Sequence, residues 1–306
     1  MSSVTLTESA KLAREELVAG VIRTVVNVDQ LFQVMPFHGI SGNALAYVRE
    51  NVRGDVQYRG VGDSITATNP ATFTKVTSSL TTLIGQAEVN QLIQETRSED
   101  GNDQTAIQIE SKARSCGDQY RDSLINGTGA GDEFTGLLSL CAVSQKVDTG
   151  VNGTVFDFDI LDELIDKVKD KNGRVDYFCL STRTRRSYFR KLRALGGAGI
   201  GETVTLPSGE QIPAYRNVPL FANDNMPIDQ VKGGSTDCTS ILAGTFDDGS
   251  MKIGIAGLTA RRNAGLGVED IGPHQTKDER LYRVKWYCGL ALFNELGLAM
   301  ADGITD

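Results

Sequence analysis

Three kinds of residue cluster in this sequence could take part in chemistry: glycine-rich stretches, a run of basic residues, and neighbouring carboxylates. Glycines cradle a phosphate when a strand precedes them and a helix opens after them. The glycine-rich stretches occupy residues 127–131, 196–201 and 265–267. The first two follow predicted helices, and the sequence has no GxxxxGK[ST] motif. We therefore expect these glycines to serve turns and hinges rather than nucleotide binding.

The strongest local charge feature is a basic run on one predicted helix, residues 182–195. The run comprises Arg183, Arg185, Arg186, Arg190, Lys191 and Arg193. Single strands of nucleic acid bind such a surface when aromatic side chains lie among the charges. Only Tyr188 and Phe189 are nearby, and both fit the buried side of the same helix. We expect a solvated face, or a face that pairs with acidic residues of a neighbouring subunit, with a nucleic-acid contact as the alternative.

Neighbouring carboxylates occur at Asp247 with Asp248, at Asp157 with Asp159, and at Asp224 between two asparagines. Adjacent side chains on a strand point to opposite faces, so they do not converge on one substrate or cation. Roles in turns and helix caps explain all three positions.

The remaining reactive residues are few and scattered. The two histidines, His38 and His274, offer little material for a metal site or a catalytic triad, and no GxSxG motif is present. The five cysteines are odd in number and form no CxxC pair, which favours reduced thiols over a disulfide framework or a zinc site. They are Cys116, Cys141, Cys179, Cys238 and Cys288. We predict no catalytic, cofactor-binding or metal-binding residues and no enzymatic activity.

Composition indicates a globular protein that does not coat nucleic acid. The chain has 306 residues, 40% of them hydrophobic and 23% charged, with a formal net charge of −8. An acidic protein neutralises phosphates poorly, although it could still form the wall of a container for nucleic acid. The start of the chain lacks the features of a signal peptide, and no run of 18 apolar residues occurs. We expect a protein made in a cytoplasm, without a membrane partner.

Hydrophobic periodicity predicts the elements that position these residues. Helices are expected at residues 5–25, 102–125, 156–171 and 182–195. Short strands are expected at 177–180, 203–206, 211–215, 218–222, 239–245 and 251–256. Helices that alternate with short strands predict an α+β fold. The helix at 102–125, with Asn102 or Asp103 as its N-cap, carries small apolar residues and should lie closely across a sheet.

Residues 45–82 have a different pattern. Two β-rich runs, residues 47–58 and 73–80, flank a turn-forming stretch at 60–70. A two-stranded ribbon of this length is marginally stable alone. It therefore either packs on its own body or borrows a surface from a neighbouring subunit, and we favour the second.

Three stretches in sequence order carry a resemblance to a known family. The first is Asn126-Gly127-Thr128-Gly129-Ala130-Gly131 with Phe134-Thr135-Gly136-Leu137-Leu138 after it. The second is Tyr215-Arg216-Asn217-Val218-Pro219-Leu220, with Asn225-Met226-Pro227 after it. The third is the apolar end of the chain, residues 281–300, introduced by Arg280 and Arg283. In this order they resemble the major capsid protein of tailed bacteriophages, which has the Hong Kong 97-type capsid fold, and Arg280 to Asp302 resembles the last long strand of that fold.

The resemblance implies a domain organisation and a function. Residues 1–42 would be an N-terminal arm and 43–82 an extended loop, a long β-hairpin. Residues 83–150 with 271–306 would form a peripheral domain with a long spine helix, and 151–270 an axial domain. The subunit would self-assemble through pentamers and hexamers into an icosahedral head that encloses double-stranded DNA. It would reside in the virion after assembly in the cytoplasm of the host bacterium.

The resemblance also implies partners, and it leaves alternatives. Besides copies of itself, the chain would meet a portal protein and a decoration protein, and would contact packaged DNA weakly without sequence specificity. The chain lacks the long scaffolding segment of the founding members, so a separate scaffolding protein or an already matured chain is expected. Some relatives crosslink a loop lysine to an asparagine; Lys75 and Asn294 lie in the corresponding regions, but we predict no crosslink from one loop lysine. The alternatives are an encapsulin-type bacterial nanocompartment shell protein, for which we find no cargo groove, and a soluble α+β enzyme.

Overall fold

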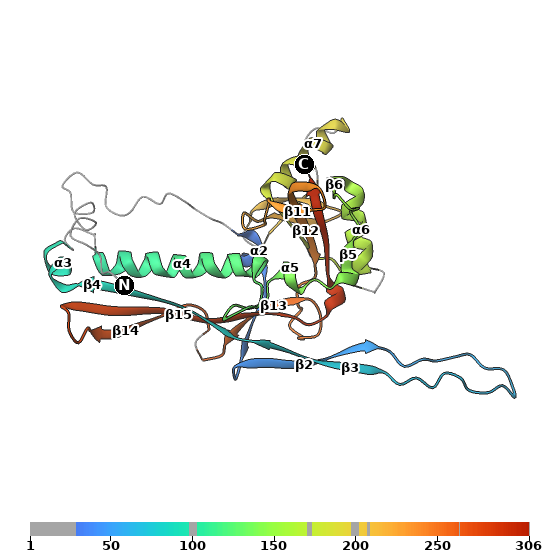
Figure 1. The fold of residues 1–306 in the computed structure, drawn as a ribbon, viewed down its shortest axis with the longest axis horizontal. Coiled ribbons are helices and arrows are strands. Elements are labelled where there is room, and N and C mark those ends of the chain that lie inside the picture. The colour runs from blue at the N-terminus through green and yellow to red at the C-terminus, as the bar shows by residue number, and fades with distance from the viewer. Residues whose placement is uncertain are drawn as a thin grey trace.

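The computed structural model describes residues 29–97, 103–169, 173–196, 202–206, 209–262 and 264–305. The helix predicted at residues 5–25, and with it most of the expected N-terminal arm, lies outside the described residues. Figure 1 shows an elongated lower body with a long helix, an upright body at one end, and a ribbon that projects away from both.

The elongated body is a five-stranded sheet built around β15 (Glu279–Leu292). β4 (Thr81–Asn90) pairs along one side of β15. On its other side, β14 (Gly267–Pro273) pairs with the first half and β13 (Ile255–Ala260) with the second. β1 (Phe37–Ile40) extends the sheet beyond β13, in parallel.

The long helix α4 (Gln104–Asn126) lies across this sheet against β4 and β15, as the sequence predicted (Figure 1). Asp103 is its N-cap, with its side chain accepting hydrogen bonds from the amides of Thr105 and Ala106. A short helix, α3 (Gln91–Arg97), follows β4 directly and contacts both β4 and α4. The helix faces β4 directly at Gly85, where an added Cβ would make ordinary contacts with Lys112 Cδ at 3.6 Å and Cys116 Sγ at 3.9 Å.

The upright body is a nine-stranded sheet in the order β5-β16-β12-β7-β10-β9-β8, with β6 beside β16 and β11 beside β12. Its strands are β5 (Lys146–Val147), β6 (Thr154–Val155), β7 (Tyr177–Leu180), β8 (Thr203–Thr205), β9 (Gln211–Tyr215), β10 (Val218–Ala222), β11 (Gln230–Lys232), β12 (Ser235–Gly244) and β16 (Leu298–Thr305). Two helices pack on it, α6 (Phe158–Lys169) and α7 (Thr182–Ala194). Both lie within a few residues of the predicted ranges. The apolar side of α6, which recurs at helical spacing in the sequence, is buried; it comprises Leu161, Leu164, Ile165 and Val168.

The two bodies share one hydrophobic core. A single cluster of buried residues contains Trp286 and Leu290 from the lower sheet together with Tyr177 and Met300 from the upper sheet. The short helices α2 (Gln30–Val34) and α5 (Leu137–Leu140), and a 3₁₀ turn, η1 (Val143–Gln145), complete this junction. Because side chains of both sheets interdigitate, we expect the two bodies to move as one unit.

The ribbon is an antiparallel hairpin of β2 (Ala44–Val52) and β3 (Thr72–Ser79). The predicted hairpin is therefore present, but its first strand ends at Val52 rather than at residue 58. The residues between the strands, 53–71, continue outward as an extended loop (Figure 1).

The prediction of one long strand from Arg280 to Asp302 is wrong. β15 ends at Leu292, and a 3₁₀ turn, η2 (Glu295–Gly297), separates it from β16. The side chain of Asn294 accepts a hydrogen bond from the amide of Leu296 at 3.0 Å, which caps the turn and redirects the chain. β16 then enters the upper sheet beside β12.

The strand expected at residues 251–256 is likewise displaced, because β13 begins at Ile255. It belongs to the lower sheet, although its residues fall within the range expected for an axial domain. The division into arm, loop, peripheral domain and axial domain stays a proposal, and the sheets are the units on which we base it below.

Candidate interaction surfaces

The described residues offer no metal-binding cluster and no exposed thiol. No group of three or more His, Cys, Asp or Glu side chains that could hold a metal ion occurs among them. All five cysteines are buried and free. Burial raises the pKa of the Cys141 thiol to about 11 and that of Cys288 to about 12, which disfavours the nucleophilic thiolate.

The glycines after α4 serve close packing. A Cβ added at Gly127 would lie 2.3 Å from the carbonyl oxygen of Phe134, and one at Gly136 would lie 2.6 Å from the amide nitrogen of Gly127. Gly129 and Gly131 have φ angles of +72° and +67°, which side chains rarely adopt. This stretch is a tight turn that returns the chain to the core, as the sequence predicted, and no described helix opens directly after it as a phosphate cradle requires.

The neighbouring carboxylates serve turns, caps and ion pairs. Asp248 accepts a hydrogen bond from the amide of Ser250 at 3.0 Å, and Asp224 accepts one from the Thr182 hydroxyl at 2.8 Å. Asp247 is buried and lies 2.7 Å from Nε2 of His38, a contact that sequence reasoning missed. The two residues come together because β1 lies alongside β13, and no local sequence signal announces that pairing.

Among the described residues, many of the large apolar side chains that are exposed to solvent lie on the hairpin. Val56, Tyr58 and Val61 in the extended loop are essentially fully exposed, and Val52 and Phe73 at the outer ends of the strands are more than half exposed. Exposed large apolar side chains that gather on one protruding element are typical of an interaction site. The hairpin beyond Val52 therefore has the properties of a surface that a second molecule covers.

The base of the hairpin, by contrast, is attached to the body. The Tyr47 hydroxyl donates to the carbonyl oxygen of Leu292 at 2.8 Å. Arg49 Nε donates to the carbonyl oxygen of Phe293 at 2.9 Å, Nη2 donates to that of Leu292, and Nη1 lies 3.3 Å from Glu295. This guanidinium holds the end of β15 at several points, so the direction of the hairpin is fixed at its root.

The two residues considered for a crosslink lie in different environments. Lys75 is on β3, opposite Val48 in the hairpin register, and is exposed. Asn294 is the N-cap of η2, so its side chain is already used within the chain.

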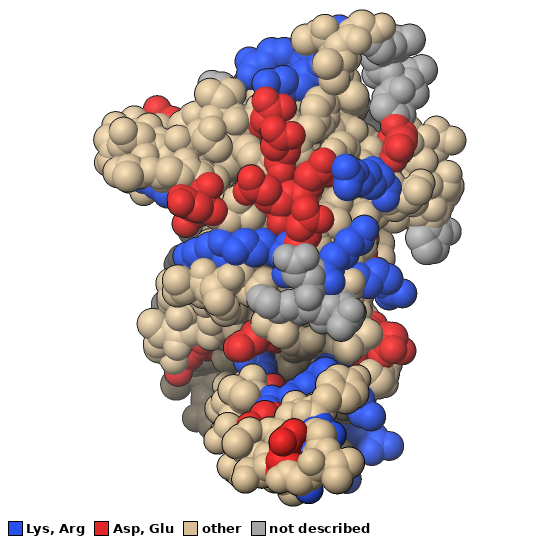
Figure 2. All heavy atoms as spheres, turned by 90° about the vertical axis from the view of Figure 1, so that its right-hand side faces the viewer, with Lys and Arg blue, Asp and Glu red and all other residues tan. Residues whose placement is uncertain are grey.

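Two helices of the upper body present opposite charges to solvent. On α6, Asp159, Glu163 and Asp166 are exposed and follow one another at helical spacing; we call them the acidic stripe. On α7, Arg185, Arg186 and Arg193 surround Phe189 and line a concave surface of about 480 Å³ together with Thr182; we call these three arginines and Phe189 the basic face. Figure 2 shows an acidic band at the height of α6 and basic side chains above it, where α7 lies.

Ion pairs within the chain leave both surfaces unneutralised. Lys191 on α7 lies 3.0 Å from Asp157, just before α6, and Arg216 lies 2.9 Å from Asp162. Arg183 is also used internally, since it donates to the carbonyl oxygens of Ile228 and Asp237. Within the described part of the chain, no ion pair involves the acidic stripe or the three arginines of the basic face.

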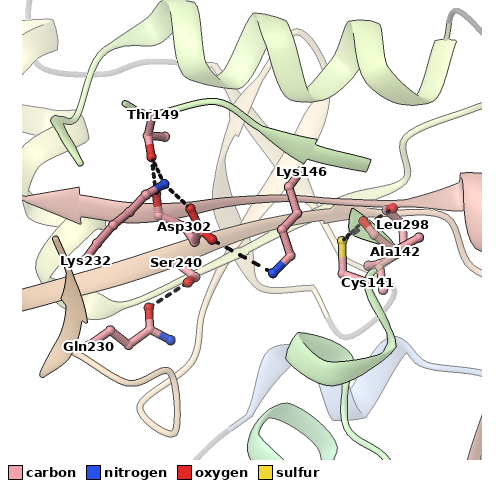
Figure 3. A network of polar contacts seen from close by, with 9 residues as sticks. All are labelled: Cys141, Ala142, Lys146, Thr149, Gln230, Lys232, Ser240, Leu298 and Asp302. Carbon is pink, nitrogen blue, oxygen red and sulfur yellow. Dashed lines mark hydrogen bonds and ion pairs between the residues drawn. The ribbon is translucent and has the colours of Figure 1, made fainter. Parts of the chain in front are cut away.

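A polar network links outer strands of the upper sheet to their neighbours (Figure 3). Lys232 on β11 donates to Thr149 and to the carboxylate of Asp302 on β16, and Lys146 on β5 lies 3.9 Å from the same carboxylate. Ser240 donates to the side-chain oxygen of Gln230 at 2.7 Å. These contacts tie the marginal strands β5 and β11 to β16 and β12, so the network stabilises the sheet edge.

None of the helices in the described part of the chain combines the length and apolar character needed to cross a bilayer. The model of the phage capsid family matches residues 10–295. No curated protein matches the chain in sequence.

Solved structures show the same fold. The holo-SrpI encapsulin complex from Synechococcus elongatus PCC 7942 is similar with a TM-score of 0.73 at 20% identity, over 99% of this chain and 96% of that one. The capsid of a native GTA particle has a TM-score of 0.66 at 13% identity, over 98% of each chain. A chain of Mycobacterium phage Adephagia has a TM-score of 0.63 at 10% identity, over 100% of this chain and 99% of that one.

Proposed function

The chain belongs to the phage capsid family, and from this we propose that it is the major capsid subunit of a phage head. As a member of that family it is a structural shell protein rather than an enzyme, with the α+β fold of Hong Kong 97-type capsid subunits. We propose that it self-assembles through pentamers and hexamers into an icosahedral shell that encloses double-stranded DNA. Assembly would take place in the host cytoplasm, and the mature protein would reside in the virion.

The observation that carries this proposal is the projecting hairpin. Its root is bonded to β15 through Tyr47 and Arg49, whereas its outer half exposes Val56, Tyr58 and Val61. A monomer gains no stability from displaying such side chains, but a tiling subunit can bury them on a neighbour. Several contacts per subunit would then add up, so that closure of a shell is cooperative even if each contact is modest.

The two sheets supply a proposed domain assignment. The lower sheet with α4 would be the peripheral domain, the upper sheet with α6 and α7 the axial domain around the symmetry axes, and β2–β3 the extended loop. In residue terms this assignment moves β13 and β14 into the peripheral domain and β16 into the axial domain, relative to the ranges 151–270 and 271–306. A separate scaffolding protein, a portal protein and a decoration protein are the further partners that we propose.

The second candidate is a nanocompartment shell, and the encapsulin likeness at a TM-score of 0.73 favours it. The two functions differ in what the shell holds. We propose that the acidic chain, with its net charge of −8, contacts DNA weakly and leaves it free to enter and leave the head.

The experiment is expression of the full chain, alone and with proteins encoded beside it, followed by size-exclusion chromatography and negative-stain microscopy. Particles from infected or induced cells are then treated with nuclease, and the protected nucleic acid is measured. Shells with long protected double-stranded DNA support the phage head. Shells that hold a folded protein and no DNA would assign the nanocompartment instead, and a small oligomer under all conditions would refute both.

A further inference from the structure

We propose that the basic face of α7 binds the acidic stripe of α6 on the next copy of this chain, in a head-to-tail contact that closes the rings of the shell. This inference rests on the proposed function, because it names the surfaces through which the subunits of a ring meet. The occupant is a second copy, and the observations that select it are charge, shape and the internal ion pairs of the two helices.

Charge complementarity is the first observation. The acidic stripe offers three carboxylates at successive turns of α6, Asp159, Glu163 and Asp166. The basic face offers three guanidinium groups, which can bind carboxylates with two parallel hydrogen bonds. The ion pairs that these helices form within the described part of the chain do not involve any of these six groups; they join Lys191 to Asp157 and Arg216 to Asp162.

Shape is the second observation. The basic face is concave, with a volume of about 480 Å³, and the half-buried ring of Phe189 contributes to its lining. The acidic stripe runs along the convex outer side of a helix. A helical ridge fits into such a depression, and arginine with an aromatic residue is the composition found at the centres of protein interfaces.

The relative position of the two surfaces favours a ring over a symmetric pair. They lie on different helices, and in Figure 1 α6 occupies the side of the upper body while α7 lies at its upper end. A contact between two different patches is heterologous, and repeating it generates a closed ring when the rotation closes. A two-fold pair would need both contacts at once, with each acidic stripe on the basic face of the other copy, whereas a ring needs only one contact per neighbour.

Nucleic acid is the less favoured occupant of the basic face. An acidic band lies below the basic side chains (Figure 2) and would repel phosphates bound beside it, and Phe189 is the only aromatic residue in the lining. Phosphate binding gains affinity from many neutralised charges, and three arginines on an acidic protein provide few.

The test is an exchange of charges between the two surfaces. Variant A carries Asp159→Lys, Glu163→Lys and Asp166→Lys, so both of its surfaces are basic. Variant B carries Arg185→Glu, Arg186→Glu and Arg193→Glu, so both of its surfaces are acidic. The control is Asp132→Lys, in an exposed turn that belongs to neither surface. Circular dichroism establishes that each variant is folded.

We expect each variant alone to lose rings and shells, and the control to assemble like the unmodified chain. Mixing A and B should restore the contact only when the two alternate. Alternation closes a ring of six and not a ring of five, so native mass spectrometry should detect mixed hexamers without mixed pentamers. The chain that carries both sets of substitutions should assemble alone.

Two results would overturn this inference while the proposed function stands: unchanged assembly of A and B, or loss of assembly that neither mixing nor the combined variant restores. Normal shells of variant B with less DNA per particle would assign the basic face to nucleic acid, which also overturns it. Failure of the unmodified chain to form rings or shells under any condition would overturn both proposals.

Discussion

The substitution Arg49→Ala tests whether the hairpin is held by its root. Arg49 donates to the carbonyl oxygens of Leu292 and Phe293 and lies 3.3 Å from Glu295. A hydrogen bond from a charged group contributes about 1.5–3 kcal/mol, and a half-exposed ion pair such as that with Glu295 contributes about 0–1 kcal/mol. The Arg49 side chain is 18% exposed, so water replaces part of the loss. We therefore expect the docked root to lose about 2–4 kcal/mol.

Amide hydrogen exchange measures this loss directly. Because every 1.4 kcal/mol is tenfold, about 2–4 kcal/mol corresponds to roughly 30- to 800-fold faster exchange in β2 and β3. The lower sheet should be unaffected. Arg49→Lys should fall between the two, since one ammonium group does not reproduce the guanidinium fork.

The matched control is Arg53→Ala. Arg53 lies on the same ribbon but is 88% exposed and 3.8 Å from its partner Glu50, so exchange should not change. Equal exchange rates in the Arg49→Ala variant and the unmodified chain would refute the view that these contacts hold the hairpin. Equal acceleration by both substitutions would show that loss of charge, rather than loss of the contact, is responsible.

Three further predictions concern the body of the subunit, and denaturant unfolding followed by circular dichroism measures each of them. A Cβ at Gly117 in α4 would meet no atom within 4 Å, so Gly117→Ala should stabilise the folded chain by about 0.4–1 kcal/mol. Gly136→Ala should destabilise it, because the added Cβ would lie 2.6 Å from the amide nitrogen of Gly127. Equal effects of the two substitutions would contradict the packing described. Tyr120 is fully buried among aromatic rings, so Tyr120→Ala should lower the free energy of unfolding by about 3–5 kcal/mol. Tyr120→Phe should lower it much less, because the hydroxyl makes one long hydrogen bond, 3.4 Å, to the carbonyl oxygen of Gly289. Similar losses for both variants would be inconsistent with a role of the ring in packing. Burial raises the pKa of Asp29 above its ordinary 3.8, so the Asp29 carboxyl binds its proton more tightly in the folded chain than in the unfolded chain. The free energy of unfolding that this carboxyl contributes should therefore fall as the pH rises from 3.8 through the raised pKa. Asp29→Asn should remove this pH dependence, and an unchanged slope would contradict the prediction.

Local periodicity was sufficient to predict the elements whose burial follows directly from it. The inward residues of α6 recur at helical spacing, and the strand at Tyr177–Leu180 is a short apolar run between turn signals, so both were predicted closely. Asp103 before α4 is a side-chain cap that a sequence can show. In these cases one segment of the chain contains the whole signal.

Features that depend on two distant segments were not predictable in this way. β15 and β16 have similar apolar content, and only a short turn capped by Asn294 separates these strands of two different sheets. The contact of His38 with Asp247 and the contacts of Arg49 with the end of β15 join residues more than 200 positions apart. The basic residues of α7 were recognised as a possible contact with a neighbour, whereas the acidic stripe was not, because carboxylates on the exposed side of an amphipathic helix are by themselves no signal of a contact.

The central claim is that this chain tiles a shell and that its hairpin lies on an adjacent subunit. Cryo-electron microscopy of purified particles tests it most directly. We expect closed shells of hexamers and pentamers, with Val56, Tyr58 and Val61 buried against a neighbouring copy while Arg49 remains bonded to its own β15. A small oligomer without shells, or a shell in which these three side chains remain exposed to solvent, would contradict the claim.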